Sequence, residues 1–206
     1  MEGNHKLRKS NDWIGNSKSV FTPLGASNHS DRERASLDFY ASPPSAITDL
    51  LAKHEIPRMS IWECAAGECN LAKPLQDAGY NVITSDIIER AEPIDYVEDF
   101  LTTTELRAPI VLTNPPYRDA CEFVLHALEL GAEYVYMFLK TTFLEGQSRY
   151  EQLFSAYPPK EIWVFTKRVQ VALNNNPEEF KKSSAVSYSW FIWEKGFNGS
   201  PSVHWI

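Results

Sequence analysis

The sequence has no long apolar segment. No run approaches the roughly 20 apolar residues that a membrane-spanning helix needs, so we expect no membrane contact. The first residues, MEGNHKLRKSNDW, contain no apolar stretch after their basic residues, which argues against a secretory signal. Both absences favour a cytoplasmic protein.

Cysteine is also scarce. The three cysteines, Cys64, Cys69 and Cys121, are odd in number and form no C-x-x-C pair, which argues against a disulfide framework or a zinc site. The five histidines show no metal-ligand spacing. We therefore predict neither disulfides nor a metal cofactor.

Positive charge is not in excess. The net charge of −7 argues against a protein that coats nucleic acid non-specifically. The charge is uneven, because residues 1–37 hold six Lys/Arg against four Asp/Glu and the rest of the chain is strongly acidic. A slightly basic arm on an acidic body can still meet phosphate locally, so charge does not exclude a nucleic-acid substrate.

The chain divides into an arm and one domain. Residues 1–37 are rich in Asn, Ser and Lys/Arg and lack hydrophobic periodicity, which predicts an extended polar arm. Residues 38–206 show regular signals, and a segment of this size buries a substantial core as a single domain.

Within that domain, short apolar runs alternate with segments of helical periodicity. The predicted strands are Ile61–Cys64, Asn81–Ser85, Ile94–Val97, Ile110–Thr113, Tyr134–Leu139, Glu161–Thr166 and Val186–Trp193. Helices are predicted from Ser45 to Leu51, from Leu71 to Gly79, from Ala120 to Leu128 and around Arg149–Ser155, and a polar loop over 172–184. The alternation predicts an α/β fold with an open, mostly parallel sheet covered by helices on both faces.

Ligands bind such sheets beyond the carboxyl ends of the strands. The first turn there is Glu63-Cys64-Ala65-Ala66-Gly67-Glu68, whose small residues let backbone amides approach a ligand and whose Glu63 offers a carboxylate. Asp86 ends the next strand, where an acid accepts hydrogen bonds from ribose hydroxyls. This pair is common to nucleotide-binding sheets and does not identify the cofactor alone.

The second turn is Asn114-Pro115-Pro116-Tyr117, after the fourth strand. A conjugated amine such as adenine N6 is a poor nucleophile because its lone pair is delocalised into the ring. The Asn114 side-chain oxygen and the Pro115 carbonyl can accept from its N–H bonds and draw the nitrogen toward tetrahedral geometry, while two prolines hold the backbone still. Tyr117 offers a face for the substrate ring or amide.

These motifs resemble those of amino methyltransferases that use S-adenosylmethionine, for which the Asn-Pro-Pro-Tyr tetrad is the signature. The motif order is similar to that of DNA adenine-N6 methyltransferases, and the arm looks like the start of small phage or prophage enzymes. The resemblance covers residues 38 to about 193. It implies a class I methyltransferase (Rossmann-like) fold with a seven-stranded sheet, and makes 38–206 the catalytic domain.

The resemblance also implies roles for individual residues. The tetrad is catalytic, and the implied cofactor contacts are Tyr40, Ala41 and Ser42 at the methionine portion, Glu63, Ala65 and Gly67 in the first turn, Asp86 and Ile87 at the ribose, and Asp99 and Phe100 at the adenine. The methyl group passes directly from sulfonium sulfur to nitrogen, and the activated donor needs no metal.

Two features depart from the family. Cys64 stands where a proline is frequent, and Cys69 stands where a second glycine is usual. No separate target-recognition domain follows the core, so sequence specificity must come from the arm, from residues 172–184 or from a partner.

A flipped base needs a second wall opposite Tyr117, and Phe180 is the candidate. Lys140 lies on the same rim after the fifth strand. The candidates for contacts with DNA phosphates are Lys167, Arg168 and Lys181.

Three alternatives stay open. The tetrad also occurs in enzymes that act on RNA bases and on protein glutamine. A non-catalytic methyltransferase-like subunit is a third possibility, against which the intact tetrad and both cofactor acids argue. A dehydrogenase-type nucleotide domain would leave the tetrad unexplained. The expected partner is DNA with an adenine-containing site, and nothing in the sequence indicates a protein partner.

Overall fold

The computed structural model describes residues 40–181 and 186–206. The expected arm, residues 1–37, lies outside the described residues, as do Asp38 and Phe39, which precede Tyr40.

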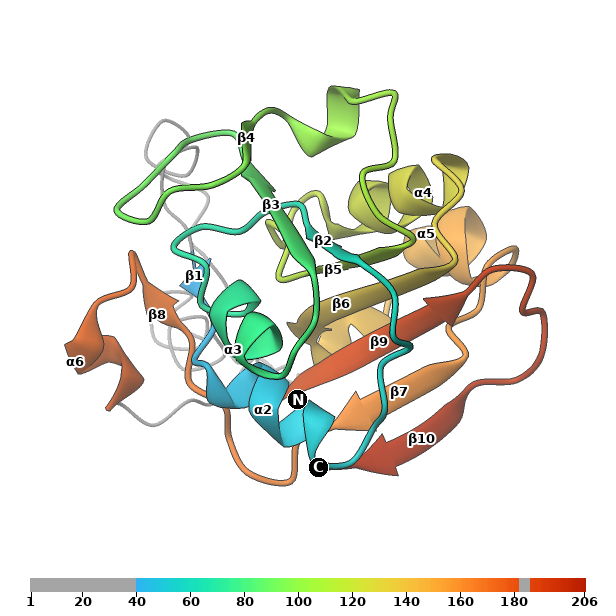
Figure 1. The fold of residues 1–206 in the computed structure, drawn as a ribbon. Helices are drawn as coiled ribbons and strands as arrows, with labels where there is room; N and C mark the ends of the chain where they lie inside the picture. The colour runs from blue at the N-terminus through green and yellow to red at the C-terminus, as the bar shows by residue number, and fades with distance from the viewer. Residues whose placement is uncertain (1–39, 182–185) are drawn as a thin grey trace, which may run out of the picture.

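The centre of the structure is an eight-stranded sheet (Figure 1). In spatial order its strands are β10 (Ser202–Trp205), β7 (Glu161–Val164), β9 (Tyr188–Glu194), β6 (Tyr134–Lys140), β5 (Ile110–Thr113), β2 (Ile61–Glu63), β3 (Val82–Asp86) and β4 (Tyr96–Val97). β9 runs antiparallel to both of its neighbours, and the other pairings are parallel. The expected α/β fold with a mostly parallel sheet is therefore confirmed.

The seven expected strands are all present, and β10 adds an eighth at the edge. It pairs in parallel with β7, and Trp205 is 65% exposed. This short, largely exposed segment has no hydrophobic run that marks it in the sequence. Only its pairing with β7 makes it a strand.

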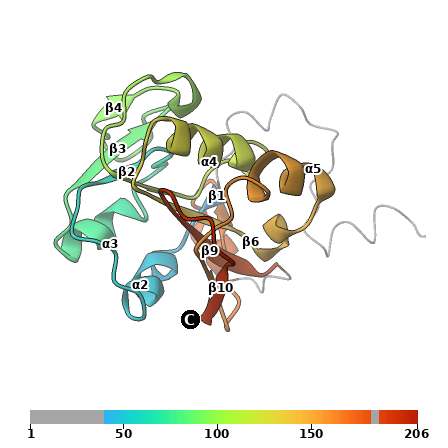
Figure 2. The same cartoon turned by 90° about the vertical axis from the view of Figure 1, so that its right-hand side faces the viewer.

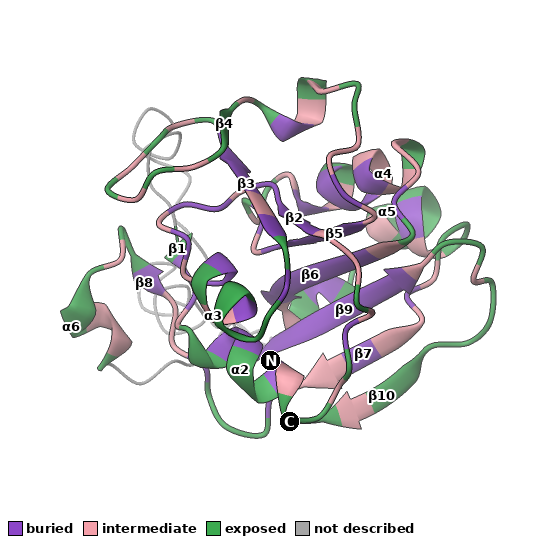
Figure 3. Cartoon of the chain, in the orientation of Figure 1, coloured by how far each residue is buried: buried purple, intermediate pink, exposed green. Residues whose placement is uncertain are grey.

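Helices cover both faces of the sheet (Figure 2). α2 (Ser45–Leu51) and α3 (Ala72–Asp77) lie on one face, and α4 (Ala120–Glu129), α5 (Gln147–Arg149) and the π-helix η3 (Tyr150–Phe154) lie on the other. Successive side chains of a strand point to opposite faces, so Ile110 and Leu112 pack with α2 and α3 while Val111 packs with α4. Buried residues line β5, β6 and β9 (Figure 3), which places the core on both sides of the central strands.

Buried tryptophans join neighbouring elements. Trp62, on β2, donates its indole N–H to Ser85 Oγ at 2.8 Å. Trp190, on β9, donates to the Ala46 carbonyl of α2 at 2.7 Å. Because each buried N–H has an acceptor, these large side chains fill the core without leaving a polar group unpaired.

A two-stranded ribbon lies beside the carboxyl edge of the sheet. β1 (Tyr40–Ala41) pairs antiparallel with β8 (Ala172–Leu173), and α6 (Pro177–Phe180) follows. We call this pair the β1–β8 ribbon. The prediction of a polar loop over 172–184 is therefore wrong for its described residues, 172–181. α6 forms because Asn176 accepts a hydrogen bond from the Glu178 N–H and Pro177 occupies the first helical position.

Two 3-10 turns complete the described elements. η1 (Phe100–Thr102) follows β4, and η2 (Thr141–Leu144) follows β6. α2 begins at Ser45 itself, and the preceding residue, Pro44, makes no side-chain cap.

Candidate active site

The loops that follow β2, β3, β5 and β6 meet at the carboxyl edge of the sheet, because these strands are parallel. The first turn after β2 touches the turn after β5, since Thr113 Oγ1 donates to the Ala65 carbonyl at 3.5 Å. The two motifs singled out in the sequence are therefore neighbours in space.

Asp86 organises the turn after β2. Its Oδ2 accepts from the Gly67 N–H at 2.8 Å, and its Oδ1 accepts from the Ile88 N–H at 3.3 Å. Gly67 has a φ of +57°, a backbone region that glycine adopts without steric cost. The carboxylate at the end of β3 thus holds the glycine turn in place.

Cys69 also has a left-handed backbone, with a φ of +59°. In the amino methyltransferases that the sequence resembles a glycine is usual at this position, and this geometry favours one, because a side chain there meets the steric cost of the left-handed region. The Cys69 side chain is buried in the core around α2 and α3, which stabilises a residue that the backbone disfavours.

Glu63 is a buried carboxyl at the end of β2. It is 2% exposed, and its Oε2 has no hydrogen-bond partner among the described residues. Burial raises the pKa of Glu63 well above its ordinary value, and the charge of Asp86 raises it further, although the Ala72 backbone N–H acts in the opposite direction. An unpaired buried acceptor in this place is suited to a ligand that donates N–H or bears positive charge.

The side-chain amide of Asn114 is held in one orientation. Its Nδ2 donates to the Tyr40 carbonyl at 2.8 Å and to Ser42 Oγ at 3.0 Å. Its Oδ1 is buried and has no hydrogen-bond partner in the part of the chain that the structure describes. Because both amide hydrogens are used, Asn114 can offer a ligand only an acceptor.

Aromatic rings surround Tyr117. Its hydroxyl donates to the Tyr188 hydroxyl at 3.1 Å, and its ring centroid lies 5.6 Å from that of Tyr40. The Lys140 ammonium lies 4.8 Å from the centroid of the Tyr117 ring. Burial and the neighbouring Tyr188 raise the pKa of Tyr117 well above its ordinary value, so it stays a neutral phenol. Tyr188 in turn stacks on Phe138 at 5.0 Å.

The residues expected at a cofactor's ribose and adenine differ in exposure. Ile87 is 55% exposed beside Asp86. Asp99 is exposed and its side chain accepts from the Leu101 N–H at the start of η1. Phe100 is buried in the core, where its ring lies 5.1 Å from that of Trp62. Phe100 therefore belongs to the hydrophobic core next to this region and not to its surface.

Of the residues expected to contact the target and DNA, Lys140 lies over the Tyr117 ring, and the others have different surroundings. Lys167 and Arg168 are exposed just after β7. Lys181 forms an ion pair with Glu178 in the same short helix. Phe180 is half-buried at the end of α6, and among the described residues no ring contact joins it to Tyr117. The rings in contact with that of Tyr117 are those of Tyr40 and Tyr188.

Sequence reasoning missed Tyr188 and Asn175. Tyr188 lies opposite Lys140 in the β6–β9 register. The sequence marked it through its place inside the strand predicted over Val186–Trp193. Asn175 Nδ2 donates to Glu68 Oε2, and its Oδ1 accepts from Asn70 Nδ2 at 3.0 Å. Only a run of three asparagines marked it in the sequence.

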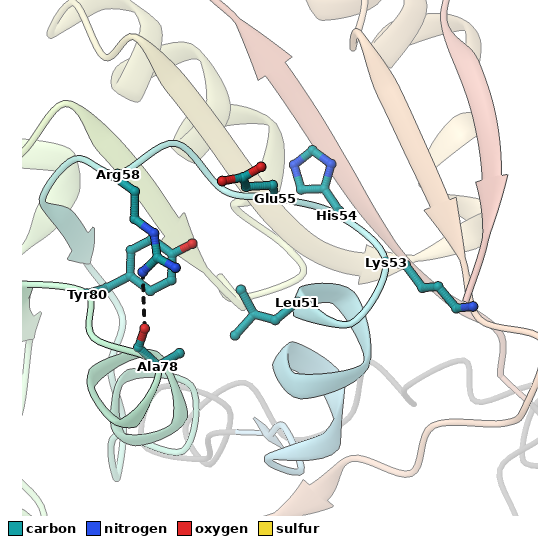
Figure 4. A pocket seen from close by; sticks show the side chains of 7 residues that line it. All are labelled: Leu51, Lys53, His54, Glu55, Arg58, Ala78 and Tyr80. Carbon is teal, nitrogen blue, oxygen red and sulfur yellow. Dashed lines mark hydrogen bonds between the residues drawn. The ribbon is translucent and has the colours of Figure 1, made fainter.

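A separate hollow of about 420 Å³ lies elsewhere. It is lined by Leu51, Lys53, His54, Glu55, Arg58, Ala78 and Tyr80 (Figure 4). These residues precede β2 and β3, at the amino edge of the sheet, and include none of the predicted site residues. We place the candidate site at the carboxyl edge, because the unpaired acceptors of Glu63 and Asn114 lie there.

No helix among residues 40–181 and 186–206 is long and apolar enough to cross a bilayer. The same ranges hold no cluster of three or more His, Cys, Asp or Glu side chains placed to bind a metal ion.

Known structures share this architecture. A Pyrococcus horikoshii protein assigned as an RNA methyltransferase matches with a TM-score of 0.53 and 14% identity, over 75% of this chain and 84% of that one. Magnesium protoporphyrin IX methyltransferase from Synechocystis, solved with bound SAM, matches with a TM-score of 0.50 and 12% identity, over 74% and 77% of the two chains.

A Vibrio vulnificus protein assigned as the modification subunit of a type I restriction enzyme matches with a TM-score of 0.53 and 11% identity. That match covers 82% of this chain but 47% of the other. No protein-family model and no curated protein matches the sequence. At these identities the matches establish the fold, which is that of class I SAM-dependent methyltransferases.

Proposed function

We propose that this protein transfers a methyl group from S-adenosylmethionine to the N6 amino group of adenine in DNA, with the base flipped out beside Tyr117. The proposal combines the methyltransferase fold with the Asn114–Tyr117 tetrad at the carboxyl end of β5.

The observation that carries the proposal is the orientation of Asn114. Both hydrogens of its amide are taken by Tyr40 and Ser42, and its buried oxygen has no partner among the described residues. A buried acceptor without a donor costs free energy, about 1–3 kcal/mol in proteins. A substrate amino group supplies the missing donor.

The residues at the end of β2 and β3 fit the cofactor. Glu63 Oε2 is a buried acceptor without a hydrogen-bond partner among the described residues, and it is suited to the ammonium of the methionine portion. Asp86 is placed to accept from ribose hydroxyls, and Gly67 leaves the backbone free of a side chain beside it. Exposed Ile87 offers an apolar surface for the adenine ring.

The bound cofactor supplies a methyl group already activated by its sulfonium charge. Asn114 Oδ1 and the Pro115 carbonyl accept from the amino group, which localises the nitrogen lone pair and aims it at the methyl carbon. The cofactor would give up its methyl group from sulfur directly to this nitrogen, and the nitrogen would lose a proton to solvent. Tyr117 stays neutral and provides a flat surface for the ring.

DNA is favoured over other substrates by the motif order. The exposed Lys167 and Arg168 after β7 lie on the same edge of the sheet and are suited to phosphates. RNA adenine and protein glutamine keep the same chemistry at Asn114, so the substrate must be decided by experiment.

The test is transfer of labelled methyl from S-adenosylmethionine to unmethylated genomic DNA, with RNA and a protein extract in parallel. We expect label in DNA, recovered as N6-methyladenine, and loss of transfer in Asn114→Ala. Asn81→Ala is the matched control, because Asn81 is exposed and its amide bonds Ser60 at the opposite edge. Label confined to RNA or protein would overturn the DNA assignment, and binding without transfer to any of them would favour a non-catalytic subunit.

A further inference from the structure

Asn175 bridges two residues of the turn that follows β2. Its Nδ2 donates to the Glu68 carboxylate, and its Oδ1 accepts from Asn70 Nδ2 at 3.0 Å. Glu68 is adjacent to Gly67, whose N–H is held by Asp86. A residue 107 positions further along the chain is thus attached to the turn expected to hold the cofactor.

The backbone around Asn175 is shaped for this bridge. Asn174 and Asn175 have φ values of +50° and +51°. Asparagine tolerates the left-handed region better than most residues, but two in succession are uncommon. They turn the chain between β8 and α6 so that the Asn175 side chain reaches Glu68.

The other end of this connection reaches Asn114. β8 pairs with β1, with Leu173 opposite Tyr40 and Ala172 opposite Ala41. The Tyr40 carbonyl then accepts from Asn114 Nδ2 at 2.8 Å. Continuous contacts therefore run from Glu68 through Asn175 and the β1–β8 ribbon to Asn114.

We propose that Asn175 is a positioning residue that couples the turn after β2 to the β1–β8 ribbon, so that binding of the cofactor orders the segment that orients Asn114. The proposal rests on the proposed function, because it assigns the cofactor to that turn. Asn175 itself touches neither the tetrad nor the expected position of the methyl group.

The coupling has a consequence for the order of events. A cofactor that immobilises Glu68 and Gly67 also immobilises β8, and through β1 it fixes the carbonyl that holds Asn114. Misplacement of a positioning group by about 1 Å can slow a reaction about a hundredfold. Binding of the first substrate thereby prepares the acceptor for the second.

Hydrogen exchange tests the proposal without an activity measurement. S-adenosylhomocysteine is added to the wild-type protein and to Asn175→Gly, which removes the bridge but keeps a residue suited to a φ of +51°. In the wild type, we expect S-adenosylhomocysteine to slow amide exchange both around Gly67 and in the β1–β8 ribbon. The expected slowing is about tenfold, which corresponds to the free energy of one charged hydrogen bond. In Asn175→Gly, the slowing around Gly67 remains and the slowing in the ribbon is lost.

Two further variants exclude a general loosening of the segment. Asn176→Ala removes the cap of α6 but leaves the bridge, so it should behave as the wild type in the ribbon. Glu68→Ala should lose the slowing of exchange in the ribbon, as Asn175→Gly does. The double variant Glu68→Ala/Asn175→Gly should differ little from Asn175→Gly alone.

The outcomes separate this proposal from the proposed function. Equal slowing of the ribbon in the wild type and in Asn175→Gly would overturn the coupling and leave the methyltransferase assignment standing. No effect of S-adenosylhomocysteine on any part of the wild-type protein would overturn the cofactor assignment and the coupling together.

Discussion

Asn114 Nδ2 lies 3.0 Å from Ser42 Oγ, although the two residues are 72 positions apart in the chain. Ser42 is 3% exposed, so its hydroxyl has little access to other partners. With the Tyr40 carbonyl as second acceptor, this contact decides which atom of the Asn114 amide faces a ligand. The segment ahead of α2 therefore orients the group that we propose to hold the substrate nitrogen.

Ser42→Ala should lower kcat for methyl transfer about tenfold, because an amide that loses one of two hydrogen bonds can rotate away from the productive orientation. Asn114→Ala should lower kcat further, because the acceptor itself is lost. Steady-state kinetics on DNA measure both. Ser45→Ala is the matched control, since Ser45 is exposed at the start of α2. Unchanged kcat in Ser42→Ala would show that Tyr40 alone orients Asn114.

Tyr117 can be divided into its ring and its hydroxyl. Tyr117→Phe keeps the ring and loses only the hydrogen bond to Tyr188, so its activity should stay within about threefold of the wild type. Tyr117→Ala should raise the KM for DNA at least about tenfold, because stacking of a base on an aromatic ring contributes about 1–3 kcal/mol. Equal losses in the two variants would indicate that the hydroxyl pair, and not stacking, is what the site needs.

Glu63 predicts a pH dependence of cofactor binding. Burial raises the pKa of Glu63 in the free protein, and the ammonium of S-adenosylhomocysteine beside it would favour the ionised form and lower that pKa. Binding should therefore release a proton. Affinity should rise with pH between the pKa of the complex and the raised pKa of the free protein, and level off above it. Calorimetry in buffers of different ionisation enthalpy measures the proton released.

Glu63→Gln serves as the control for this linkage, because it cannot ionise. Its affinity should be weaker at neutral pH and should lack the proton release. The folded pKa lies above the ordinary value of 4.5, so the wild type loses stability as pH rises from that value toward the raised pKa. Glu63→Gln should not show this loss in urea unfolding. Proton release by Glu63→Gln equal to that of the wild type would assign the titration to another group.

Much of the fold was accessible from the sequence because the central strands are buried on both faces. Ile110–Thr113 is a continuous apolar and β-branched run, and the Asn114-Pro115 step that follows must end it. Parallel strands bring their carboxyl ends to one edge of the sheet. Because Glu63, Asp86 and Asn114 each stand at the end of a predicted strand, the sequence was sufficient to place them at the same edge.

The remaining features depend on contacts between distant segments. β8 is two residues long and exists because Ala172 pairs with Ala41, and β10 exists because it pairs with β7. Neither has a hydrophobic period of its own. The Asn114 amide is likewise oriented by residues from a distant segment, Tyr40 and Ser42. The Tyr40 ring beside Tyr117 comes from that segment too, so a local sequence pattern could not identify it.

Cys69 gives a test of the backbone in the turn after β2. With a φ of +59°, a cysteine there bears a steric cost of about 1–2 kcal/mol that glycine avoids. Cys69→Gly relieves this cost, but it also loses a small buried side chain and increases the freedom of the unfolded chain, so the gain and the losses oppose each other. We expect its free energy of unfolding to lie within about 1 kcal/mol of the wild type, with cofactor affinity retained.

Cys69→Val should differ sharply from Cys69→Gly. A β-branched side chain is poorly tolerated in the left-handed region, so a loss of more than about 2 kcal/mol is expected in urea unfolding, together with weaker S-adenosylhomocysteine binding. Cys121→Val is the matched control, because Cys121 lies in α4 with a helical backbone and pays only the small helix-propensity cost of valine. Equal losses at positions 69 and 121 would mean that side-chain burial, and not the left-handed turn, determines what residue 69 can be.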